Sequence, residues 1–269
     1  MNTKNTNPKT LQIVNIIAVV VVIVMNILSS ALPLNGRSVE SISDALPSYF
    51  TPVGSTFAIW GLIYAALLGF GIYQALPAQR ERPFLAKIGW LFALSTLFNV
   101  AWLFAWHYGV YLLSILFMVA LLGTLITIYL RLNIGRPDAA LTTADKLLYQ
   151  APFSLYLGWI TVATIANIAS VTAYWGWDGF GIAGQLWSAI MMMVAVVVAG
   201  VLLFNRRNLA YAGVLVWALL GIRAAFPAVP VIANTALIAA ALIVILALIG
   251  YWRTRDAKPA SLEPQTQAA

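Results

Sequence analysis

Apolar runs, separated by short polar segments, follow one another along almost the whole chain. Each has about 20 residues, the length at which an α-helix crosses the roughly 30 Å of hydrocarbon in a bilayer. The strict alternation that marks a membrane strand is absent from the sequence. Because backbone groups in lipid must be hydrogen-bonded within the protein, the pattern predicts a helical bundle. The eight predicted spans are residues 11–34, 52–76, 85–107, 110–131, 147–171, 183–204, 209–226 and 231–252.

The composition agrees with an all-α integral membrane protein, a polytopic bundle of eight transmembrane helices. Hydrophobic residues make up 62% of the chain and charged residues 9%, whereas soluble domains have about 25% charged residues. The chain has no cysteine, which excludes disulfides, thiol catalysis and thiolate metal sites.

Basic residues fall unevenly when the loops are assigned alternately to the two sides of the membrane. Of the 15 lysines and arginines, only Arg37 and Arg223 lie on one side. Basic loops stay in the cytoplasm, so we expect both termini there, in the bacterial inner (cell) membrane. The net charge of +7 then belongs to loops that face anionic lipid, which makes membrane lipid, and no nucleic acid, the expected partner.

Three segments need separate interpretations. The first apolar run is longer than the core of a signal peptide and lacks a small-residue cleavage site, so we expect an uncleaved anchor. The external loop 35–51 carries apolar and aromatic residues and is either a lid folded over the helices or an ordinary solvated connector. Residues 254–269, rich in Pro, Gln and Ala, are expected to be disordered.

Two asparagines stand beside tryptophans inside predicted spans. Asn99 precedes Trp102 by three residues, and Trp159 precedes Asn167 by eight, so each pair shares one helix face. A buried amide costs free energy unless it is hydrogen-bonded, which makes these positions candidates for a site between helices. The alternative is structural: the tryptophans pack the helices and the asparagines bond across helix interfaces.

A third aromatic stripe follows the external loop. Pro52 favours a helix start there, and Phe57, Trp60 and Tyr64 then follow at positions i, i+3 and i+7. Tryptophan faces would bury a flat aromatic ligand, while asparagine amides would bond its polar edge.

The order and spacing of these residues resemble the TspO and translocator-protein family, the tryptophan-rich sensory proteins. The resemblance covers residues 11–172 and implies a five-helix core, residues 1–172, with a pocket open toward the loop between its first two helices. Residues 173–253 would then form a three-helix extension that the five-helix core lacks. By the resemblance, the pocket-facing residues are Trp60, Asn99, Trp102, Trp159 and Asn167, with Phe57 and Tyr64 from the same stripe.

The same resemblance implies ligands and a partner. Family members bind porphyrins, haem or related tetrapyrroles, and eukaryotic relatives bind cholesterol and benzodiazepine-type drugs. Porphyrin or haem would be a bound ligand here, with no cofactor required. A homodimer is also implied, and the small residues Gly89 and Ala93, four apart in the third predicted span, would permit close helix approach.

Three classes of function follow. The first is a membrane receptor, sensor or translocator for tetrapyrroles or similar hydrophobic ligands. The second is a secondary transporter of another hydrophobic or amphipathic solute, although all eight acidic residues fall outside the predicted spans, where proton coupling would need one. The third is light-dependent porphyrin degradation, as the resemblance implies for bacterial members.

Other enzymatic chemistry is not expected, because the sequence shows no catalytic triad, phosphate loop or paired carboxylates. The one histidine, His107, is either an interfacial side chain or a haem ligand. It makes no zinc site without a second nitrogen or sulfur ligand, so we expect no metal centre.

Overall fold

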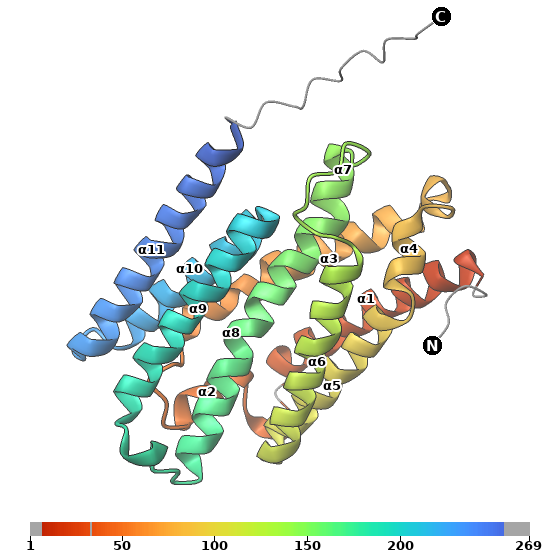
Figure 1. The fold of residues 1–269 in the computed structure, drawn as a ribbon. Helices are drawn as coiled ribbons and strands as arrows, with labels where there is room; N and C mark the ends of the chain where they lie inside the picture. Colours follow the sequence, from red (N-terminus) through yellow and green to blue (C-terminus); the bar gives the residue numbers. More distant parts are fainter. Residues whose placement is uncertain (1–6, 33, 256–269) are drawn as a thin grey trace, which may run out of the picture.

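The computed structural model describes residues 7–255 except residue 33. It is helical, with no strand in the described part of the chain (Figure 1). Among the described residues, the eight long helices are α1 (Pro8–Ala31), α3 (Ile59–Ala75), α5 (Leu91–His107), α6 (Tyr111–Arg131), α8 (Ala151–Tyr174), α9 (Gly184–Arg206), α10 (Leu209–Ala225) and α11 (Pro230–Arg255). The short elements are η2 (Leu34–Gly36), α2 (Val39–Ala45), η3 (Gly54–Ala58), η4 (Pro77–Gln79), α4 (Pro83–Ile88), α7 (Thr143–Asp145), the π-helical turn η5 (Lys146–Gln150) and η6 (Gly179–Gly181). The tail expected to be disordered lies outside the described residues, apart from the end of α11.

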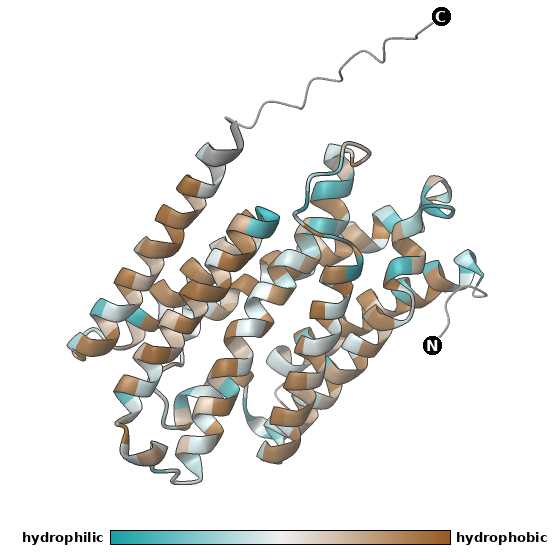
Figure 2. Cartoon of the chain, viewed as in Figure 1, coloured by the Kyte–Doolittle hydropathy of each residue, from teal (hydrophilic) through white to brown (hydrophobic). Residues whose placement is uncertain are grey.

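These helices confirm an all-α polytopic membrane protein. Six of the described helices are long and apolar enough to cross a membrane, and α5 and α10 are apolar but have 17 residues each. Seventeen residues rise about 25 Å, close to the lower limit for a span. Large apolar side chains such as Leu97 and Val197 are exposed on the outer faces, and Figure 2 shows polar residues mainly near the helix ends.

The third predicted span, residues 85–107, is not one continuous helix. It is broken into α4 and α5 at Gly89, whose φ of 52° is in the left-handed region that ends helices. Gly89 and Ala93 therefore do not lie on one helix face, and their spacing no longer supports the expected dimer contact. The dimer itself stays a prediction.

Helix α8 is central because both halves of the molecule pack against it. It contacts α3 and α6 from the first half and α9 and α10 from the second. Gly158 permits the close approach of α10, since a Cβ there would lie 3.0 Å from the Val214 Cβ. The backbone N–H of Val53 also donates to the Gly221 carbonyl of α10 at 3.1 Å. The predicted extension is thus packed against the predicted core along α8 and at the loop before α3.

The two ends of the bundle differ in charge. The basic end comprises the start of α1, the turns 76–83, 132–142 and 207–208, and the end of α11. The opposite end comprises residues 34–58, 108–110, 175–183 and 226–229 (Figure 1). The alternation expected from the sequence is therefore present, with α1 starting and α11 ending at the basic end.

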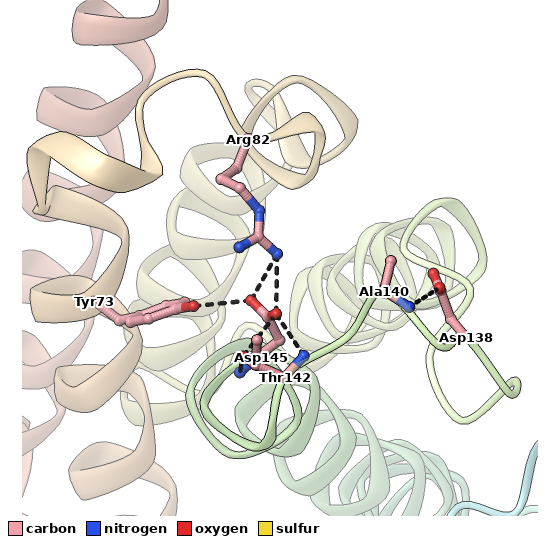
Figure 3. Close-up of polar contacts among 6 residues, drawn as sticks. All are labelled: Tyr73, Arg82, Asp138, Ala140, Thr142 and Asp145. Carbon is pink, nitrogen blue, oxygen red and sulfur yellow. Dashed lines mark hydrogen bonds and ion pairs between the residues drawn. The ribbon is translucent and has the colours of Figure 1, made fainter.

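An ion pair between a buried aspartate and a half-buried arginine lies at the basic end (Figure 3). The Asp145 side chain is fully buried and accepts hydrogen bonds from Arg82 Nη2 at 2.9 Å and from the Tyr73 hydroxyl at 2.8 Å. Thr142 adds its backbone N–H and its hydroxyl, both at 2.9 Å, closing a capping box. The hydrogen bond with Asp145 raises the pKa of Arg82, so the pair stays charged. The sequence had placed this carboxylate in a loop; the structure places it at a helix start, out of solvent.

Candidate functional site

Most of the residues in the predicted site converge on one small cavity, here called the tryptophan cavity. It has a volume of about 40 Å³. Three helical segments supply its aromatic wall, and the loop before α3 covers it. Its lining includes Val39, Ser43, Pro52, Phe57, Trp60, Trp102, Trp106, Met118, Trp159, Ala163 and Asn167.

Aromatic rings fill the wall of the tryptophan cavity edge to face. Trp60 and Trp159 have ring centroids 6.2 Å apart at 78°, and Phe57 and Trp159 are 5.6 Å apart at 81°. Trp102 stacks on Trp106 at 6.1 Å. Edge-to-face and offset-stacked contacts add to the free energy of burial, so these five side chains support one another.

The Asn167 amide holds its place through two bonds. Its Oδ1 accepts from the Trp102 indole N–H at 3.2 Å, and its Nδ2 donates to the Ser114 hydroxyl at 3.1 Å. These bonds link α5, α6 and α8 inside the bundle. Interhelical bonding, the structural alternative for the asparagines, is thus present at a residue that also lines the cavity.

Two predicted site residues, Asn99 and Tyr64, do not line the tryptophan cavity. Asn99 lies about one turn nearer the basic end than Trp102, and Tyr64 lies about one turn nearer that end than Trp60. Residues three or four apart share a helix face but differ by about 5 Å along the helix axis. Tyr64 stacks on Trp60 at 5.3 Å. Asn99 is fully buried and accepts from Asn26 Nδ2 at 2.7 Å, while its own Nδ2 has no partner among the described residues.

The loop between α1 and α3 folds back as a lid over the cavity. Ile42, Leu46 and Phe50 are buried, so the alternative of a solvated connector does not apply. The Trp106 indole N–H points at the Val39 carbonyl at 3.5 Å, and Asn35 Nδ2 donates to the His107 carbonyl at 3.0 Å. These contacts tie the lid to the end of α5.

Two residues at the end of the third predicted span are buried, so the interfacial alternative for His107 does not apply. Trp106 is 2% exposed, and His107 is 3% exposed with its Nδ1 hydrogen-bonded to the Leu103 carbonyl at 2.7 Å. The lid covers both, a tertiary contact that their position near a span end does not reveal. His107 lines neither cavity, which leaves it no position to ligate haem iron in one.

A second and much larger cavity, the α8–α9 cavity, lies at the opposite end from the ion pair. Its volume is about 970 Å³, and it is lined by parts of the lid, residues 43–54, the end of α8, the start of α9 and the end of α10. Trp177 and Trp187 are among its lining residues. The sequence around Trp177 and Trp187 does not predict this cavity, because its walls come from four segments that are far apart in the chain.

The lining of the tryptophan cavity suits an uncharged aromatic ring system better than a charged group. Lysine, arginine and histidine are absent from its described lining, and Asn167 supplies its amide. Groups of three or more His, Asp or Glu residues that could hold a metal are likewise not found in the described part of the chain.

Comparison with known proteins adds the family. The model of the family described as TSPO-like protein matches residues 12–249. The match continues through α9 and α10 and into α11, beyond the residues that carried the resemblance. Neither curated proteins nor solved structures gave a match. Since the match covers most of the sequence, this multi-pass membrane protein belongs to the TSPO-like family, in the general class of membrane receptors and translocators.

Proposed function

We propose that the protein is a membrane receptor or translocator that binds a flat aromatic ligand, with tetrapyrroles such as porphyrin or haem as the candidate class. The observation that carries this proposal is the convergence of Trp60, Trp102, Trp159 and Asn167 on one buried cavity. Family membership supports the general class, and the aromatic wall supports the ligand chemistry.

Binding a tetrapyrrole requires the cavity to open. A volume of about 40 Å³ is far below the roughly 300–1,000 Å³ of sites for drug-sized ligands. The lid is the element that would move, because it covers the cavity from a loop, whereas the other walls are packed helices. Ser43 and Pro52 line both cavities, so displacing this segment would join them.

The test is titration of the full-length protein in detergent with protoporphyrin IX, followed by tryptophan fluorescence. Trp159→Phe removes one face of the proposed site and should weaken the affinity about fivefold, the effect of losing about 1 kcal/mol of ring contact. Trp175→Phe is the matched control, since Trp175 is 53% exposed and lines neither cavity.

Equal affinity in the wild type and both variants would exclude the tryptophan cavity as the porphyrin site. Secondary transport of another hydrophobic or amphipathic solute would then become the leading function. Running the titration in light and in darkness also addresses the third class, because photochemical degradation predicts loss of porphyrin absorbance only under illumination.

For the cellular location we propose the bacterial inner membrane, with the basic end in the cytoplasm. The concentration of Arg80, Arg82, Arg131, Arg136 and Lys146 at that end supports this orientation.

A further inference from the structure

The α8–α9 cavity is a second pocket, lined by α8 residues that lie further along the helix than most of those that line the tryptophan cavity. Ile165, Ala169 and Thr172 line it, whereas Trp159, Ala163 and Asn167 line the tryptophan cavity. At 100° per residue these named sets point more than a right angle apart around the helix, whereas Val162 and Ala166, which also line the tryptophan cavity, point to the same side as Ala169. A ligand bound here would contact the C-terminal helices, which the proposed tetrapyrrole site does not use.

The charged groups in this pocket are acidic. Asp44 from the lid and Asp178 from the loop before α9 line it, and lysine, arginine and histidine are absent from its described lining. Both carboxylates lie on exposed residues, and the structure gives neither an ion-pair partner among the described residues. This is the reverse of what an anionic ligand, such as a porphyrin with its propionates, requires.

Two serines supply polar groups that the protein itself does not use. Ser43 is 9% exposed and Ser188 is 6% exposed, and both line the pocket. Neither hydroxyl has a hydrogen-bond partner in the described part of the chain, and neither is sealed from the cavity. Because buried hydroxyls are normally satisfied, these two are available to a ligand's N–H group.

Aromatic pairs complete the lining on two sides. Tyr49 of the lid contacts Phe226 after α10 with centroids 5.5 Å apart, and Trp177 contacts Trp187 at 5.6 Å. Ring faces attract cations as well as apolar surface. Much of the remaining wall is apolar, as Ile165 and Met191 illustrate.

We propose that the α8–α9 cavity binds a hydrophobic cation, an amine or quaternary ammonium whose apolar body lies against α8 and α9 and whose positive charge lies near Asp44 and Asp178. The cavity volume of about 970 Å³ accommodates such a molecule. The two cavities share only Ser43 and Pro52 among their described lining residues, and either proposal stands if the other fails.

The experiment uses two probes of the same shape and opposite charge, tetraphenylphosphonium and tetraphenylborate. Each is equilibrated by dialysis with the full-length protein in nanodiscs of neutral phosphatidylcholine, and uptake by empty nanodiscs is subtracted. The test variant is the double change Asp44→Asn with Asp178→Asn. Asparagine preserves the turn in which Asp178 Oδ1 accepts from the Phe180 N–H at 3.1 Å.

The matched control is Asp138→Asn. Asp138 is also exposed and also accepts a backbone N–H two residues on, from Ala140 at 2.9 Å, but it lies at the basic end and lines neither cavity (Figure 3). A second variant, Ala169→Trp, fills the pocket from α8 without changing charge.

We expect saturable tetraphenylphosphonium binding that the double variant weakens about tenfold, the sum of two partly exposed charge contacts. The same variant should leave tetraphenylborate binding unchanged or tighter. Asp138→Asn should bind like the wild type, and Ala169→Trp should lose the cation site. Equal binding of the two probes, or a double variant that binds the cation like the wild type, would overturn the proposal.

Discussion

At the scale of single residues, Asp145 is buried although its sequence position, between two predicted spans, is typical of an exposed loop. Its carboxylate is surrounded by Tyr73, Arg82 and Thr142, which come from α3, the turn before α4 and the N-cap of α7, respectively. Removing the buried carboxylate would leave its hydrogen-bond donors unpaired, and this costs more free energy than the intact cluster contributes.

We therefore expect Asp145→Ala to lower the free energy of unfolding by about 3 kcal/mol, since Tyr73 and Arg82 both lose their acceptor. The measurement is the apparent midpoint of thermal unfolding in detergent. Asp138→Ala, which removes an exposed acid in the turn before α7, should change stability by less than about 0.5 kcal/mol. A midpoint for Asp145→Ala within the range of this control would show that the cluster does not stabilise the fold.

At the scale of elements, α10 holds the lid through close backbone contact. Gly221 accepts the Val53 N–H at 3.1 Å, and a Cβ on Gly221 would overlap the Thr56 side chain. The Trp217 indole N–H donates to the Thr56 carbonyl at 2.9 Å, one turn earlier on the same helix. The lid, which separates the two cavities, is thus positioned by a helix that the sequence assigned to an extension.

Gly221→Ala should therefore destabilise the protein by about 1–3 kcal/mol, as overpacking usually does, and should displace residues 51–56. The matched control is Gly213→Ala on the same helix, where a Cβ would meet nothing within 4 Å and where alanine favours the helix. Thermal unfolding measures the first effect, and proteolysis of the lid measures the second. Equal stability of the two variants would contradict the close packing of α10 on Thr56.

At the scale of the whole molecule, the unequal charge of the two ends predicts its orientation in the membrane. The chain has no cysteine, so single cysteines report accessibility without background. Ala139→Cys lies in the turn before α7 at the basic end, and Phe180→Cys replaces a residue that is 81% exposed at the opposite end.

In intact cells a membrane-impermeant maleimide should label Phe180→Cys and leave Ala139→Cys unlabelled. Permeabilised cells should label both, which controls for reactivity. The reversed pattern would place the basic end outside the cytoplasm, and labelling of both cysteines in intact cells would contradict a single orientation.

The sequence determined the class of fold and the number of apolar helices. An apolar run long enough to cross the bilayer can be identified in the sequence itself, and in lipid such a run must be helical to satisfy its backbone. It also grouped the residues of the tryptophan cavity by helix face, since i, i+3 and i+4 spacing is set by the helix alone. Phe57, Trp60, Trp102, Trp159 and Asn167 all line that cavity, while their role in ligand binding stays a prediction.

The tertiary structure alone decided which residues lie at the same height and which segments meet. It placed Asn99 and Tyr64 one turn nearer the basic end than the tryptophan cavity. It also buried Trp106 and His107 under the lid and brought Asp145 into contact with Arg82. The α8–α9 cavity likewise arises from four segments far apart in the chain. Such contacts depend on how helices tilt and on how loops fold back, which no local pattern of apolar and polar residues specifies.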